Sequence, residues 1–293
     1  MKIVKIIVLT CLAVGLFVFA NSCKKAPTNT QTDFKQEMEV IKETQYPQQF
    51  ANQFMLTFFK SIYDSTLLNT GLSKIDSAKV IMDTAKIRVE YWYMNENRHW
   101  HHYDGNGHYR MGTFDYLIDS AFLASTTGIC PVSVYKTFYF DSLPTSIQNI
   151  SIEKTGLSAA GNQTFKATFN NITMSGNYAG KTTIHFSAEF NYELFKDPSS
   201  PYSSNNDYLL FSGNIQGTTS SSYNYNITIS PDSSRYKIDY QCWYTIEGKS
   251  TATISGGTVP AGNILLDYIT EDGCANFYEV TFPEIFSTKS HIE

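Results

Sequence analysis

Apolar residues recur at helical spacing near the beginning of the chain. Phe50, Phe54 and Phe58 follow one another at intervals of four residues, so they lie on one face of an α-helix. Pro47 precedes this run and is suited to the first turn of a second helix. We predict a helical segment over residues 34–72, with one or two amphipathic helices that pack their phenylalanine stripe on a sheet. The alternative is that the stripe forms a face for binding lipid or ligand.

From about residue 78 the apolar pattern changes its period to two. Ile87 and Val89 alternate with Arg88 and Glu90, as expected for a strand with one buried face. Similar runs continue almost to the end of the chain, separated by short clusters of Gly, Asn, Asp and Ser that favour turns. Short connections favour antiparallel hairpins, and no alternation of strands with helices suggests a parallel sheet.

The predicted fold class is therefore mainly β. One or more N-terminal amphipathic helices pack on a large antiparallel β-meander over residues 73–293, which folds into a sandwich or a half-barrel. A chain of 293 residues is long enough for one large domain or two small ones. Segment 197–206, rich in Ser, Pro and Asn, is the best candidate for a boundary between modules.

The first two dozen residues have the pattern of a secretory signal. Lys2 and Lys5 precede an apolar run over residues 6–20, which is too short to span a bilayer as a permanent helix. Asn21, Ser22 and Cys23 follow the run. The whole segment resembles bacterial lipoprotein signals, in which cleavage precedes a cysteine that receives diacylglycerol.

This resemblance implies a signal peptide over residues 1–22 and lipidation of Cys23, with acyl chains such as palmitate inserted in the membrane. Several acyl chains on one residue give stable anchoring. Residues 23–33 would then form a flexible, lipidated tether. Surface-exported lipoproteins of this type often carry acidic residues after the cysteine, whereas Lys24 and Lys25 follow it here. We expect an outer-membrane lipoprotein that faces the periplasm rather than the cell surface.

Composition narrows the choice of partners. The formal net charge is −5, and cleavage removes Lys2 and Lys5, which gives −5 − 2 = −7 for the mature chain. An acidic chain without a basic cluster argues against nucleic acid as a partner. Aromatic residues make up 15% of the chain, which suits pleated sheet surfaces and is too many for a disordered protein.

Two further segments carry a family resemblance. Residues 104–112 read DGNGHYRMG, and residues 272–276 read DGCAN. Together with the lipoprotein-like start and the helix, they resemble a group of uncharacterised Bacteroidota-type β-rich lipoproteins, which have a DG-x-x-R-x-G hairpin and a C-terminal DGC-x-N turn. The resemblance implies a β architecture and an envelope location. It implies no particular activity.

Three cysteines remain after Cys11 leaves with the signal and Cys23 takes lipid. An oxidising compartment permits a disulfide between Cys242 and Cys274, with Cys130 left as a free thiol. The alternative is that all three are buried, unpaired cysteines that behave as small hydrophobic residues.

Histidines flank the predicted turn at residues 104–107. An even-numbered loop would place His99, His101, His108 and Arg110 on one face, together with Tyr103. Three imidazoles can bind Zn²⁺ and leave an open position. Because Arg110 on the same face would repel a cation, and no further ligand is evident, we predict sheet packing, no metal and no cofactor.

The sequence offers candidates for sugar binding but no common catalytic motif. Trp92, Trp100 and Tyr103 are candidates for an aromatic platform under a sugar ring. The chain has no H-E-x-x-H, P-loop or dinucleotide motif, and residues 156–160 lack the second glycine of a nucleophile elbow. We therefore predict that the protein is not an enzyme.

Asp followed by Ser or Thr recurs in the first half of the chain. Bacteroidota-type secreted proteins carry O-glycans at such positions, so the candidates for modification are Ser65, Ser77, Thr84, Ser120 and Ser142. The alternative is that Asp and Ser simply favour turns and helix caps.

The sequence therefore indicates a non-catalytic envelope lipoprotein that serves as a binding or structural module for an unknown ligand. Its expected partners are membrane lipid, through the acylated Cys23, and a glycan or an envelope protein. One alternative is a carbohydrate-binding lipoprotein of a glycan-uptake system. Another is a fimbria-like adhesin subunit.

Overall fold

The computed structural model describes most of the chain beyond residue 34. The described residues are 35–91, 94–95, 98–99, 102–103, 109–141, 143–176, 183–199, 206–242, 245–256, 262–269, 277–282 and 286–291. The chain divides into two compact units, Met1–Glu39 and Val40–Glu293, and the fold below is that of the second unit. None of the described helices is long and apolar enough to cross a membrane.

A single long helix, α2 (Lys35–Tyr63), opens the described chain. Pro47 lies inside it, so no second helix begins at this residue. Proline removes one helical hydrogen bond, but packing around the helix outweighs this local preference. The side chains of α2 are buried almost continuously from Val40 to Phe59, which supplies that packing.

Two short helices follow. Helix α3 (Ser65–Thr70) begins at an Asp64 side chain that accepts a hydrogen bond from the Leu67 amide, and it ends at Gly71 in the left-handed conformation. Helix α4 (Ser120–Ala124) begins in the same way at Asp119, whose carboxylate accepts from the Phe122 amide. Both helices are therefore specified by local capping residues.

One antiparallel sheet makes up most of the second unit, and its main path runs through fourteen strands in nearly sequential order. These strands are β1 (Leu72–Ile75), β2 (Ala78–Met82), β3 (Ile87–Glu90), β7 (Tyr109–Tyr116), β8 (Thr127–Phe140), β9 (Leu143–Leu157), β10 (Gln163–Ser175), β11 (Thr183–Phe195), β12 (Tyr208–Thr218), β13 (Asn224–Ile229), β15 (Thr245–Ser255), β16 (Asn263–Ile269), β17 (Phe277–Phe282) and β18 (Phe286–His291). The order confirms the predicted antiparallel meander.

Four short strands lie off this path. Strand β14 (Tyr236–Asp239) pairs with β12 and β15, and β6 (His102–Tyr103) pairs with β7. Strands β4 (Met94–Asn95) and β5 (Arg98–His99) form a separate two-stranded sheet. Strands β11 and β12, on either side of the segment predicted as a module boundary, are neighbours in the main sheet.

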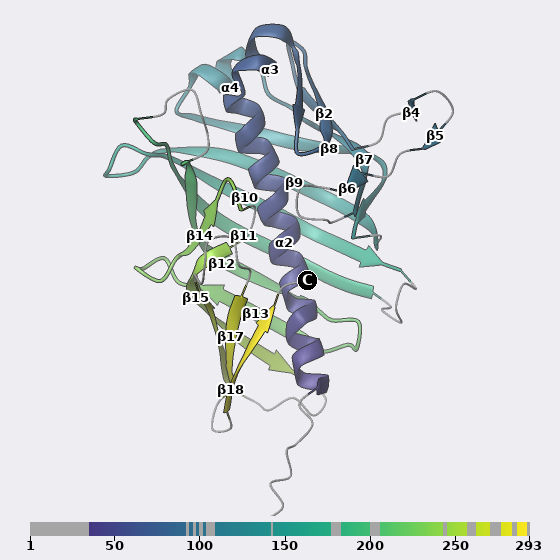
Figure 1. Cartoon of the computed structure of the whole chain (residues 1–293), viewed down its shortest axis with the longest axis vertical. Coiled ribbons are helices and arrows are strands. Elements are labelled where there is room, and N and C mark those ends of the chain that lie inside the picture. Colours follow the sequence, from purple (N-terminus) through teal and green to yellow (C-terminus); the bar gives the residue numbers. More distant parts are fainter. Residues whose placement is uncertain are drawn as a thin grey trace, which may run out of the picture. The chain divides into compact units, whose positions relative to one another are not determined.

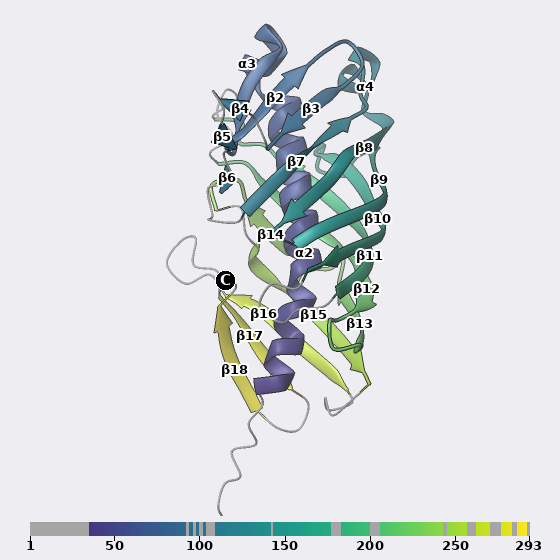
Figure 2. The same cartoon turned by 90° about the vertical axis from the view of Figure 1, so that its right-hand side faces the viewer.

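The sheet curves around α2, which lies along its concave face (Figures 1 and 2). The continuous curved sheet corresponds to the half-barrel alternative rather than to two stacked sheets. Aromatic rings form the contact between helix and sheet. Phe54 stacks on Phe114 with 4.3 Å between ring centroids, and Phe59 meets Phe165 edge-on at 4.7 Å. The predicted packing of the phenylalanine stripe on the sheet is therefore confirmed.

Candidate functional site

A polar groove of about 680 Å³ crosses five neighbouring strands, β10, β11, β12, β13 and β15. It lies on the outer face of the sheet, away from α2. The face is identified by Phe186, whose ring packs 5.9 Å from that of Phe50 on the helix. Because strand side chains alternate between faces, His185 and Ser187 on either side of Phe186 point outward.

Two rows of side chains border this groove. The strand registers align the first row as Thr173, His185, Thr218, Asn224 and Ser255. They align Ser187, Gln216, Asn226 and Thr253 in the second row. Asn171, in the bulge of β10, joins this row through a hydrogen bond from its backbone amide to Ser187 Oγ. Each of the five strands contributes one residue to each row, so hydroxyl, amide and imidazole groups repeat from strand to strand.

Between the rows, the lining comes from residues whose side chains belong to the core. Ile172, Phe186 and Ile254 are all buried. At Gly217, a Cβ atom would overlap the carbonyl oxygen of His185 on the adjacent strand. Glycine therefore allows β11 and β12 to approach closely in the floor of the groove.

The outward side chains that border the groove are polar and uncharged. Among the described residues that line it, there is no Asp, Glu, Lys or Arg. Thr173 Oγ1 lies 2.9 Å from His185 Nδ1, and these groups share a hydrogen bond. Just outside the groove, Glu189 is paired with Lys166 at 2.9 Å. Such a surface offers many hydrogen bonds to a neutral ligand and little attraction to an ion.

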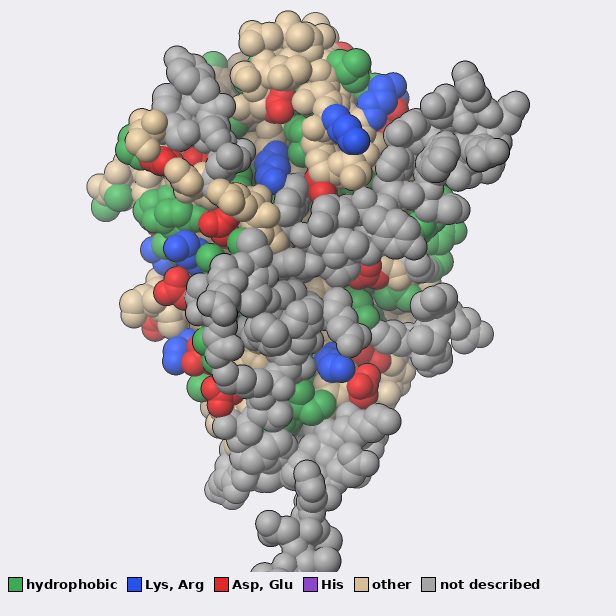
Figure 3. All heavy atoms as spheres, viewed as in Figure 1, with side chains coloured by type: hydrophobic (Ala, Val, Ile, Leu, Met, Phe, Trp, Pro, Cys, Tyr) green, Lys and Arg blue, Asp and Glu red, His purple; other side chains and the backbone are tan. Residues whose placement is uncertain are grey.

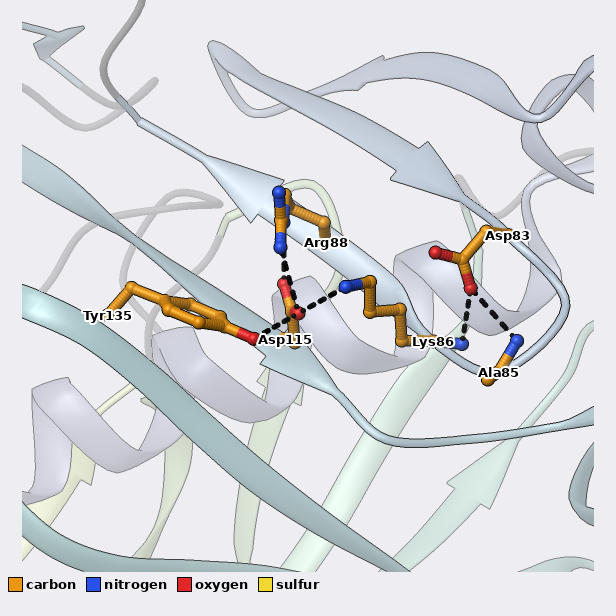
Figure 4. A network of polar contacts seen from close by, with 6 residues as sticks. All are labelled: Asp83, Ala85, Lys86, Arg88, Asp115 and Tyr135. Carbon is orange, nitrogen blue, oxygen red and sulfur yellow. Dashed lines mark hydrogen bonds and ion pairs between the residues drawn. The ribbon is translucent and has the colours of Figure 1, made fainter.

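Several charged side chains elsewhere in the described part of the chain form local ion pairs. On the face shown in Figure 3, acidic and basic side chains of the described residues are interspersed. One cluster of the described residues surrounds Asp115, whose carboxylate contacts Arg88 at 2.9 Å and Lys86 at 3.1 Å and accepts a hydrogen bond from Tyr135 at 2.9 Å (Figure 4). Burial alone would raise the pKa of Asp115, but these hydrogen bonds outweigh it and hold the pKa below its usual value. Lys86 and Arg88 are therefore both paired with the buried carboxylate of Asp115.

A buried amide-rich face on α2 is the main feature that the sequence analysis missed. Gln45, Gln48, Gln49, Asn52 and Gln53 lie opposite the phenylalanine stripe, and all are buried. A polar helix face normally marks the solvent side. Here the curved sheet brings distant partners to that face as well, so the helix is enclosed on both sides.

The directions of the hydrogen bonds on this face follow from the number of available protons. Thr44 Oγ1 donates its proton to the carbonyl oxygen of Ile41, so it accepts from Gln45 Nε2. Gln45 therefore presents Oε1 to the hydroxyl of Tyr268, which donates at 2.7 Å. Tyr268 has no second proton, so Gln48 turns its Nε2 toward the phenol oxygen, at 3.2 Å.

This chain of donors leaves one end of Gln48 without a partner. Its Nε2 also donates to Thr245 Oγ1 at 3.0 Å, and Oε1 then has no donor among the described residues. The side-chain oxygens of Gln49 and Asn52 likewise have no donor among the described residues. Buried polar atoms without partners are costly, so this face is less stable than its hydrogen bonds alone suggest.

Arg110 extends the polar face of α2 to strand β7. Its side chain is buried, donates from Nη2 to Gln53 Oε1, and lies over the Phe140 ring at 3.7 Å from the centroid. Asp141 Oδ1 lies 3.5 Å from Nη1. Arg110 was expected on the same hairpin face as the histidines, whereas in the structure its side chain joins the sheet to the helix.

The predicted parity of the histidine hairpin is wrong. Tyr103 lies opposite Tyr109 and His102 lies opposite Arg110. Five residues separate the paired tyrosines, so odd-numbered positions pair with odd-numbered positions and even with even. The prediction assumed a loop with an even number of residues, which would pair odd positions with even ones. A shift of one residue moves every position to the other face.

The remaining members of the histidine and aromatic candidates are separated or lie outside the described residues. His99 belongs to β5 and pairs with Met94 in the separate two-stranded sheet. His101, His108, Trp92 and Trp100 lie outside the described residues, and so do Cys23, Ser142 and Cys274. No group of three or more His, Cys, Asp or Glu that could hold a metal is found in the described part of the chain.

Four of the five Asp-Ser and Asp-Thr pairs lie at turns and caps of the described residues. Ser65 and Ser120 directly follow the capping aspartates of α3 and α4. Ser77 has positive φ in the turn between β1 and β2, and Thr84 lies in the turn between β2 and β3. These placements agree with the local preference of Asp and Ser, and the possible O-glycosylation stays a prediction.

The cysteines differ in state. Cys130 is a buried free thiol whose pKa is raised by burial. Cys242 is bonded in a disulfide. Because Cys130 is free, the partner of Cys242 lies outside the described residues, and its pairing with Cys274 stays a prediction.

Comparisons with known proteins add no relative: no family model, no curated protein and no solved structure matches the chain.

Proposed function

We propose that this protein is a non-catalytic, carbohydrate-binding envelope lipoprotein, and that the outer groove is its binding site. The observation that carries this proposal is the double row of neutral hydrogen-bonding side chains across five strands. Amide groups such as those of Gln216 and Asn226 both donate and accept, as sugar hydroxyls also do. A neutral polyhydroxylated ligand satisfies them without the desolvation of an ion.

A binding role without catalysis suits the lining. Glycoside hydrolysis in most enzymes uses a pair of carboxylates on either side of the bond to be cleaved. The described residues that line the groove include no carboxylate. A sugar held there would therefore be bound and not cleaved by this pair mechanism.

The envelope location rests on the sequence. The apolar run over residues 6–20 and the Ser22-Cys23 junction support cleavage and lipidation of Cys23. Mass spectrometry of the mature protein should find an acylated N-terminal Cys23, and Cys23→Ala should release the protein from membranes. Retention of the variant on membranes would contradict the lipid anchor without affecting the proposed groove.

The groove itself is tested by a pair of matched double variants. Gln216→Ala with Asn226→Ala removes two paired amides from the second row. The control, Asn214→Ala with Thr228→Ala, removes the neighbouring exposed pair on the same two strands, which does not line the groove. Binding of neutral oligosaccharides, measured by calorimetry, should weaken in the first variant and persist in the control. Equal binding by both would contradict the proposed site.

A further inference from the structure

The length of the groove is informative about its ligand. It spans four steps between adjacent strands, and at about 4.8 Å a step this gives a path of roughly 19 Å. A single sugar ring covers only a small part of such a path. A ligand that uses the whole groove is therefore elongated and lies across the strands.

The width and repeat of the groove agree with a chain. The two rows are two residues apart along each strand, which is about 7 Å. Gln216 and Thr218 border the groove on β12, with Gly217 between them in the floor. On each neighbouring strand, two outward residues likewise flank one residue in the floor of the groove. A polymer with repeating hydroxyl groups therefore meets repeating hydrogen-bonding partners along both of its sides.

Two other elongated ligands fit this surface less well. A peptide that adds a strand to a sheet needs a free edge, whereas β11, β12 and β13 are each paired on both sides in this region. A polyanion such as nucleic acid or an acidic polysaccharide needs Lys or Arg, and the described lining has neither.

We infer that the groove takes a linear, neutral polysaccharide, held along its interior units by hydrogen bonds and not by one of its ends. This inference rests on the proposed function and goes further, because a module that recognises a free sugar end would satisfy the proposed function equally well. The described lining has no exposed aromatic platform, so side-by-side hydrogen bonds from many strands carry the recognition.

The test is a chain-length series on the full mature protein. The probes are neutral glucan, mannan and xylan oligosaccharides from two to six units, the same hexasaccharides with reduced ends, and a polyuronate of six units. Calorimetry should show affinity that rises with length for at least one neutral series. End reduction should leave the affinity of that hexasaccharide unchanged, and the polyuronate should bind more weakly.

A variant at one end of the groove sharpens the result. Thr253→Ala removes a hydroxyl from β15, the last strand of the path. It should weaken binding of the hexasaccharide by roughly 2- to 10-fold, as expected for one hydrogen bond, and should leave a disaccharide unaffected. The matched control Thr251→Ala lies on the same strand outside the groove and should change neither affinity.

The outcomes separate the two proposals. Equal affinity for a disaccharide and a hexasaccharide, or loss of binding on end reduction, would overturn the inference and leave carbohydrate binding intact. Preference for the polyuronate would overturn the neutral character of the ligand. Failure of every neutral probe to bind would overturn both the inference and the proposed function.

Discussion

The two faces of helix α2 are buried to a similar extent by different chemistry. Phe54 is 4% exposed and Gln48 is 2% exposed, although one belongs to an apolar stripe and the other to an amide stripe. The apolar face packs on aromatic rings from β7 to β11, and the amide face is held by hydroxyl groups of β15 and β16. Burial of a helix in this fold is thus decided by the sheet around it and not by its own amphipathic pattern.

The two faces differ in how many of their buried polar groups need, and have, hydrogen-bond partners. Phenylalanine rings need no hydrogen-bond partner, so each ring stabilises the folded protein roughly in proportion to the apolar area that it buries. Amides require a partner for each end, and Gln48 has partners among the described residues for its nitrogen alone. We therefore expect substitutions on the two faces to change the free energy of unfolding by different amounts and even with opposite sign.

The largest effect is expected on the aromatic face. Phe54→Ala should reduce the free energy of unfolding by about 3–5 kcal/mol, because it removes a ring that contacts Phe114, Tyr116 and Phe138 and leaves a cavity. Urea unfolding measures this change. Leu68→Ala, at a 45% exposed position of α3, is the control and should cost far less. Similar losses in both variants would show that the stripe does not form the core contact.

The next effect concerns Gln53, where the amide face meets a charge. Gln53→Met removes the oxygen that accepts from the buried Arg110, and should cost about 1.5–3 kcal/mol, as for a hydrogen bond to a charged group. Gln53→Glu keeps an acceptor and adds a negative charge beside the guanidinium, so it should be less destabilising. Thermal unfolding of both variants decides the point, and the reverse order would mean that Arg110 is satisfied elsewhere.

A smaller effect of opposite sign is expected at Gln48. Gln48→Met removes the unpartnered Oε1 and also the two hydrogen bonds that Nε2 donates to Thr245 and Tyr268. The loss of these two bonds costs little, because Thr245 still accepts from Asn52 and Tyr268 still donates to Gln45. The melting temperature should rise, by an amount that corresponds to about 1 kcal/mol. Gln45→Met is the matched control and should destabilise, because it removes the acceptor of Tyr268. Clear destabilisation by Gln48→Met would mean that its oxygen has a partner.

The effect expected at Lys60, between the two faces, is the one that depends on pH. Burial lowers its pKa to about 8, although Asp76 and Asp239 act in the opposite direction. Between pH 8 and the unfolded value of 10.5 the unfolded state binds more protons, so stability from this group rises with pH. Lys60→Met should therefore be more stable than the wild type at pH 7, and the difference should shrink as the pH approaches 10. A difference independent of pH would exclude a depressed pKa for Lys60.

The candidate groove shows how far a functional site can be read from such a sequence. Its residues come from positions 171 to 255, and they meet because four consecutive antiparallel registers align them. One local signal was available. Outward positions such as Ser187, Gln216 and Asn226 are neutral and polar on one strand after another. That pattern marks an uncharged surface, but only the pairing of distant strands brings these positions together in one groove.

The sequence alone determined the elements whose cause is local. The spacing of Phe50, Phe54 and Phe58 predicted a helix packed on a sheet, and the alternation from Ile87 onward predicted the antiparallel meander. Both periods reflect which side of an element can be buried, and neighbouring residues are enough to define that side.

Only the tertiary structure decided the features that need contacts between distant residues. Pro47 stays inside a continuous helix because the surrounding sheet outweighs its local preference. The amides of α2 are buried because Thr245 and Tyr268, about two hundred positions away, supply their partners. The histidine hairpin has the opposite parity because one residue of register is set by pairing with β7. Local sequence leaves such choices nearly equal in energy, and the closed packing of helix and sheet selects between them.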